Sequence, residues 1–156
     1  MKRLLFTLAT CCVMCACEQK TEMNPFFTEF QTEYGAPDFT KIRLEHYEPA
    51  FLKGIEEQNA EIKAIVDNPE EPTFENTIVA LDKSGGILAR VSGVFFALTE
   101  ADTNDSLTAL NEKMAPVLSE HSDNIYLNQD LYKRVADVHQ QEKEGKITLT
   151  DRKSVV

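Results

Sequence analysis

Cysteine is confined to the start of this sequence, where Cys11, Cys12, Cys15 and Cys17 are its only copies. The rest of the chain can therefore form neither a disulfide framework nor a thiolate metal site, and its fold must rest on an apolar core. His-Glu-x-x-His and EF-hand spacings are also missing, and the six glycines form no phosphate-binding loop. These absences exclude the most readily recognised metal and nucleotide sites.

Basic residues are scarce relative to acidic ones. Sixteen lysines and arginines stand against 26 aspartates and glutamates, which gives a formal net charge of −10. This excess of acid argues against a nucleic-acid partner and against electrostatic attachment to anionic lipids. Hydrophobic residues make up 42% and charged residues 27% of the 156-residue chain, as expected for one globular domain or a piece of a larger one.

The first residues have the pattern of a bacterial lipoprotein signal. A short basic start precedes an apolar run over residues 4–14, which is too short to span a bilayer as a stable anchor. Ala16 is a small residue before Cys17, and the sequence turns polar directly afterwards. We expect residues 1–16 to be removed and Cys17 to be lipidated. The protein would then be exported and anchored in a bacterial membrane, facing the periplasm or the cell surface. An ordinary cysteine-rich signal peptide is the alternative.

Residues 17–45 are predicted to form a tether and an extended arm. No helical or strand period holds between residues 24 and 40, yet this stretch is rich in aromatic side chains, which linkers usually lack. We therefore predict an arm that docks its aromatic residues into grooves of a helical body, rather than a disordered linker. The aromatic residues are Phe26, Phe27, Phe30, Tyr34 and Phe39.

Helical periodicity predicts an all-α domain over residues 46–156. Its longest apolar stripe predicts a single helix from Thr73, the N-cap, to about Glu100, against which the other helices pack. Gly85 and Gly86 within it cost about 1 kcal/mol each relative to alanine, so close packing or a bend is expected there. The stripe consists of Phe74, Ile78, Leu81, Gly85, Leu88, Val91, Phe95 and Leu98.

Three further helices flank this one in the sequence. The first is expected from Tyr47–Pro49 to about Asn68, the third after Asn104 or Asp105 with a kink at Pro116, and the fourth after Asn128. A fifth would begin near residue 150, where few residues remain, so we expect the helical domain to be incomplete at its C-terminus. The predicted inward residues are Phe51, Ile55, Gln58, Ile62, Ile65, Val66, Leu107, Leu110, Met114, Val117, Leu118, His121, Ile125, Leu131, Val135 and Val138.

The residues alone give no catalytic or metal-binding assignment. His46, His121 and His139 are far apart in the sequence, and His121 lies on a buried stripe where a hydrogen-bonded structural histidine is the more common role. Paired carboxylates such as Glu56 and Glu57 are abundant, but in an acidic chain they are expected to be solvated.

Two segments carry a resemblance to a known family. They read NPEEPTFENTIVALDKSGGILARVSGVFFALTEADTN and APVLSEHSDNIYLN, and the arm adds His46-Tyr47 with Pro49-Ala50-Phe51. This sequence closely resembles the N-terminal helical region of the zinc oligopeptidases that include thimet oligopeptidase, oligopeptidase A and the bacterial peptidyl-dipeptidases. Within that group it is most similar to the peptidyl-dipeptidases. The resemblance covers residues 24 to 153.

The resemblance implies a multi-helix N-terminal subdomain of a larger, almost wholly α-helical metallopeptidase that acts on short peptides. Family members bind zinc through a His-Glu-x-x-His helix and a downstream glutamate, and none of these ligands can be placed on a residue of this sequence. We therefore expect no catalytic residue, no metal ligand and no cofactor in this chain, and no peptidase activity without a catalytic domain, its expected partner. The ending Ser154-Val155-Val156 departs from the family and suggests truncation. The alternative is a non-enzymatic helical lipoprotein that acts as a binding module.

Overall fold

The computed structural model describes residues 23–147. The predicted signal peptide, Cys17 and the start of the fifth helix lie outside these residues. Within residues 23–147 every regular element is helical, which confirms the predicted all-α class. No helix in this range is both long and apolar enough to cross a bilayer.

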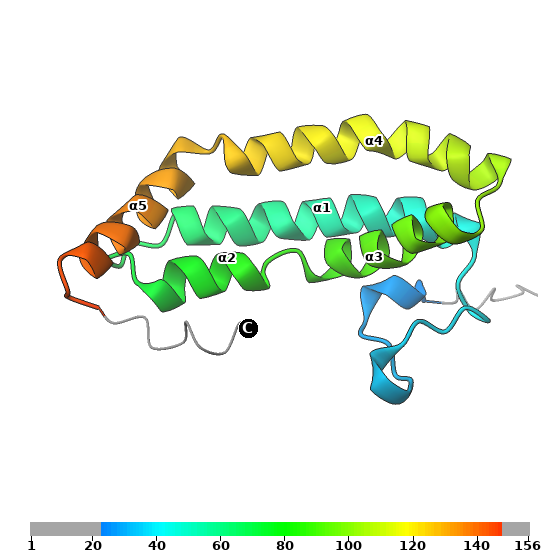
Figure 1. The fold of residues 1–156 in the computed structure, drawn as a ribbon, viewed down its shortest axis with the longest axis horizontal. Helices are drawn as coiled ribbons and strands as arrows, with labels where there is room; N and C mark the ends of the chain where they lie inside the picture. Colours follow the sequence, from blue (N-terminus) through cyan, green and yellow to red (C-terminus); the bar gives the residue numbers. More distant parts are fainter. Residues whose placement is uncertain (1–22, 148–156) are drawn as a thin grey trace, which may run out of the picture.

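The central element is α1, Leu44–Val66. It begins a few residues before the predicted start, because His46 Nδ1 accepts a hydrogen bond from the backbone N–H of Arg43 at 3.1 Å and caps the helix. Helices α3, α4, α5 and α2 all contact α1. The sequence prediction that the other helices pack against the segment 73–100 is therefore wrong: α1 holds that place, with α2 and α3 along one side and α4 along the other (Figure 1).

The predicted single helix over Thr73 to Glu100 is divided in the structure. It consists of η3, a π-helical segment at Phe74–Val79, then α2, Ala80–Lys83, and α3, Gly86–Ala101. The break lies at Gly85, which has φ of +76°, a left-handed conformation that favours glycine. Its N–H donates to Glu61 Oε2 at 2.7 Å, and a Cβ at this position would lie 2.6 Å from the Gln58 side chain. Contacts with α1 thus require the break.

The predicted helix caps are confirmed. Thr73 Oγ1 accepts from the N–H of Asn76 at 3.0 Å, and Asn76 Oδ1 accepts from the N–H of Thr73 at 2.8 Å, so each residue caps the other. Asn104 caps α4, Asp105–Tyr126, and Asn128 caps α5, Gln129–Lys143. Helix α4 continues through Pro116.

The main core lies where α1, α3, α4 and the N-terminal arm meet. Phe95 is fully buried, with ring centroids 5.2 Å from Tyr47 and 5.3 Å from Phe51. Edge-on aromatic contacts at such distances stabilise a core beyond the area they bury. Gly54 allows α1 and α3 to approach closely, since a Cβ there would lie 2.7 Å from the backbone nitrogen of Leu88. A second, smaller cluster joins Ile62 and Ile65 of α1 to Leu131 of α5.

The arm docks through one aromatic residue above all. Phe26, in the short 3-10 helix η1 (Pro25–Phe27), is fully buried, and Arg90 Nη1 donates to its carbonyl oxygen at 2.7 Å. Phe30 packs at the edge of the same core. Tyr34, in η2 (Glu33–Gly35), is 96% exposed and Phe39 is 56% exposed, so the predicted docking holds for only part of the arm.

Candidate functional site

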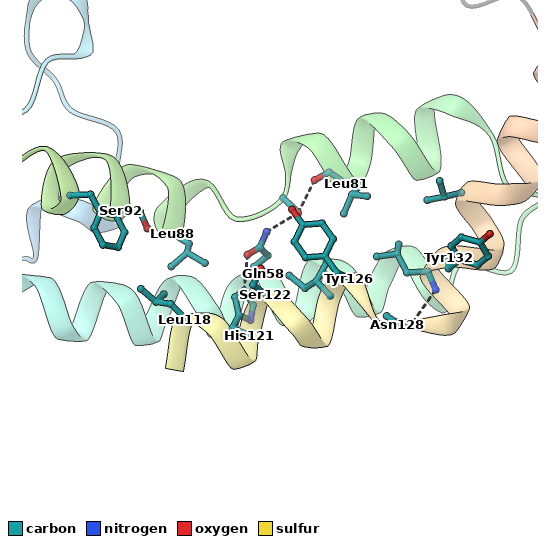
Figure 2. Close-up of a pocket in the computed structure, with 15 residues that line it drawn as sticks. Gln58, Leu81, Leu88, Ser92, Leu118, His121, Ser122, Tyr126, Asn128 and Tyr132 are labelled. Atoms are coloured by element: carbon teal, nitrogen blue, oxygen red, sulfur yellow. Dashed lines mark hydrogen bonds between the residues drawn. The ribbon is translucent and has the colours of Figure 1, made fainter. Parts of the chain in front are cut away.

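A groove of about 530 Å³ runs along one face of the described helices. Its walls come from α2 and α3 on one side and from α4 and α5 on the other, and α1 contributes Gln58 (Figure 2). The volume lies within the range of small-molecule pockets, about 300–1,000 Å³. The lining is mainly apolar, with Leu81, Leu88, Leu118 and Ile125 among its residues.

A chain of hydrogen bonds crosses the groove from α4 to the end of α2. His121 Nε2 lies 2.7 Å from Gln58 Oε1, Gln58 Nε2 donates to Ser84 Oγ at 3.2 Å, and Ser84 Oγ donates to the carbonyl oxygen of Leu81 at 2.8 Å. Because Gln58 presents its oxygen to the histidine, His121 donates through Nε2–H. The neutral ring then carries its lone pair on Nδ1.

The surroundings of His121 favour its neutral form. The residue is only 6% exposed, and burial lowers the pKa of its imidazole. Nδ1 is buried and makes no hydrogen bond to any residue the structure describes, so protonation would place an unpaired N–H in the interior. His121 is therefore a buried structural residue, as predicted from its position on the stripe.

Comparison with known protein sequences identifies relatives of this chain. No family model matches the chain. It is 48% identical to dipeptidyl carboxypeptidase of Escherichia coli over 120 residues, which cover 77% of this chain and 18% of the relative. It is 46% identical to the dipeptidyl carboxypeptidase of Salmonella typhimurium over 118 residues, 76% of this chain and 17% of the relative. Oligopeptidase A of Escherichia coli is 26% identical over 132 residues, 85% of this chain and 19% of the relative.

The chain belongs to the dipeptidyl carboxypeptidase and oligopeptidase A family. This confirms the family predicted from the sequence. The chain spans less than one fifth of the length of these relatives.

The three histidines of this chain do not form a joint site. His46 caps α1, His121 lies in the groove, and His139 is on α5 with Nδ1 3.4 Å from Glu142 Oε2. Between residues 23 and 147 there is no group of three or more histidine, cysteine, aspartate or glutamate side chains that could hold a metal ion. The described residues therefore do not fit a zinc site.

Arg134 is a key polar residue that the sequence analysis missed. It is 8% exposed, and its Nη1 donates to the carbonyl oxygen of Asn68 at 2.9 Å while Nη2 lies 3.3 Å from Asn76 Oδ1. Both nitrogens also reach the carbonyl oxygen of Glu70 at 3.4 Å. Arg134 thereby fixes α5 to the loop between α1 and η3. The sequence did carry one signal that Arg134 is buried: it lies three residues after Leu131, on the inward face of the helix.

Proposed function

We propose that this chain is a helical scaffold region of a zinc-dependent peptidase that acts on short peptides and releases dipeptides from their C-termini. The observation that carries this proposal is the 48% identity, over most of the chain, to a protein named dipeptidyl carboxypeptidase. Identity at this level over 120 residues also favours the peptidyl-dipeptidase branch over oligopeptidase A, which is 26% identical. Short peptides are then the substrates of the whole enzyme.

The proposed role is structural, and it assigns no chemical step to residues 23–147. Zinc would activate water for attack on the peptide bond when bound. Since the described residues offer no cluster suited to a metal ion, we assign the zinc ligands to a catalytic domain that acts together with this region. The contribution of the scaffold is its packed α1 and α3, with the break at Gly85 that shapes one wall of the groove.

We also propose that the protein is exported and anchored in a membrane through acyl chains on Cys17. The support is the sequence pattern alone: a basic start, a short apolar run, and Ala16 before the cysteine. Cys17→Ser is expected to move the protein from the membrane fraction to the soluble fraction. The same distribution for both forms would contradict lipidation.

A chimeric enzyme tests the peptidase assignment. The 120-residue segment of the Escherichia coli dipeptidyl carboxypeptidase that matches this chain is replaced by the corresponding segment of this chain. We expect the chimera to release C-terminal dipeptides in a chelator-sensitive reaction, whereas the purified 156-residue chain releases none. A matched chimera carrying Gly54→Val should lose activity, because the added side chain would meet the backbone of Leu88.

Two results would contradict the proposal. One is a folded but inactive chimera, which would mean that this segment cannot serve as the scaffold of such an enzyme. The other is zinc-dependent, chelator-sensitive release of dipeptides by the purified chain alone.

A further inference from the structure

We propose that the groove between α3 and α4 binds an amphipathic α-helix that belongs to the remainder of the peptidase. This inference rests on the proposed function, since it takes the occupant from the part of the enzyme outside the matched segment. More than four fifths of the length of the dipeptidyl carboxypeptidase relatives lies outside that segment. Ample chain is therefore present in such an enzyme to supply a helix.

The groove is selective for an uncharged occupant. None of the residues that line it is an aspartate, glutamate, lysine or arginine, although such residues make up 27% of the sequence. Depletion of charge at the centre and enrichment of aromatic residues are typical of surfaces that become buried on association. Phe96, Tyr126 and Tyr132 also line the groove, and they are 40%, 82% and 66% exposed. Their exposure leaves apolar area for a partner to cover.

The hydrogen bonds of the groove favour a helix over an extended peptide. Gln58, Ser84 and His121 already hydrogen-bond with one another. The polar groups left to face an occupant are all at the ends of side chains: the hydroxyls of Ser92, Ser122, Tyr126 and Tyr132 and the amide of Asn128. An extended peptide would bury backbone N–H and C=O groups that find few partners here, and each such group costs free energy. A helix satisfies its backbone internally.

The arrangement of the walls suits a helix as well. Helices α3 and α4 both line the groove, so a helix laid in it would contact both (Figure 2). Ser92 on α3 and Ser122 on α4 are small, which allows helix axes to approach to about 8–10 Å. We expect apolar residues at positions i, i+3, i+4 and i+7 of the occupant, with no charge on that face.

Peptide binding tests this inference. The probes are overlapping 20-residue peptides that cover the Escherichia coli dipeptidyl carboxypeptidase outside its matching segment. We expect at least one peptide with an apolar helical face to bind the purified 156-residue chain and to gain helical circular dichroism on binding. The double variant Ser92→Glu/Ser122→Glu should bind it at least tenfold more weakly. The control Ser119→Glu adds charge to an exposed position of α4 outside the groove and should stay within twofold of the unmodified chain.

Three results would overturn the inference, provided that thermal melts show every variant folded. These are failure of all peptides to bind, equal binding by the double variant, and dimerisation of the unmodified chain that the double variant abolishes. The last result would assign the groove to a second copy. The chimera experiment measures dipeptide release, whereas the peptide assay measures binding to the groove. An active chimera without peptide binding would refute the docking proposal and leave the proposed function standing.

Discussion

The two sides of α1 differ in how they are closed. On the α3 side, Gly54 brings the backbones together and Phe95 is surrounded by aromatic rings, so that this side is a finished core. On the α4 side, contact with α1 is sparser: Leu107 and Met114 of α4 join the same core, but the groove beside His121 leaves Tyr126 of α4 open to solvent. The core is closed by the chain itself, whereas the groove between α3 and α4 has the composition of a surface to be covered.

The largest effect should come from Phe95→Ala, which removes a fully buried ring from the closed side. Such truncations cost about 3–5 kcal/mol. The control is Phe96→Ala, which removes the same side chain one position later, where it is 40% exposed beside the groove. Urea unfolding should show a much larger loss for Phe95→Ala. Equal losses would mean that the core and the groove do not differ in packing.

Arg134→Ala should cause the second-largest loss in the free energy of unfolding. It leaves the carbonyl oxygens of Asn68 and Glu70 without their buried donor, and hydrogen bonds from charged groups contribute about 1.5–3 kcal/mol. Lys133→Ala, which removes an exposed contact with Asp130, should cost less than about 1 kcal/mol. A loss for Arg134→Ala no greater than that for Lys133→Ala, measured by urea unfolding, would show that Arg134 does not fix α5 to this loop.

Thr73→Ala should have an intermediate effect on the free energy of unfolding. The substitution removes the oxygen that accepts from the N–H of Asn76, and loss of an N-cap typically costs about 1 kcal/mol. Thr73→Ser keeps the acceptor and serves as the control. If serine and alanine destabilise the chain equally in thermal melts, the cap does not contribute.

The smallest expected effect is on how the stability of the chain depends on pH. Burial lowers the pKa of His121 in the folded chain, so folding favours the neutral ring. The stabilisation that this contributes is full above the ordinary histidine pKa of about 6.5 and is lost as the pH falls from there through the folded pKa. His121→Gln should flatten the loss of stability between pH 7.5 and 5.5, as measured by urea unfolding at each pH. An unaltered profile for His121→Gln would refute this linkage.

Features that depend on local sequence were predictable. The caps Thr73, Asn104 and Asn128 were found because a capping side chain bonds to amides two or three residues away. The buried role of His121 followed from its place on a helical stripe. The family followed from two long runs of matching residues.

Features that depend on distant partners were not predictable in the same way. The break at Gly85 requires Glu61 and Gln58 of α1, and periodicity alone continued the helix through it. Arg134 bonds to groups 58 to 66 residues away, and nothing in its neighbourhood marks them. The central place of α1 reflects packing on several sides, whereas the apolar stripe was longest in the segment 73–100. The groove arises only when α3 and α4 are both packed against α1.

The central claim is that the core between α1 and α3 is complete in the free chain, whereas the groove beside α4 binds a further helix. Native-state hydrogen exchange on the purified chain tests this claim most directly. Amides in α1 and α3 should exchange only through global unfolding, while amides in α4 exchange through local opening with a lower free energy. Saturation with a groove-binding peptide should slow exchange in α4, and it should also slow the amides that exchange through global unfolding, because the peptide binds only the folded chain. Equal protection of α3 and α4 in the free chain would contradict the account, because both sides would then be complete without a partner.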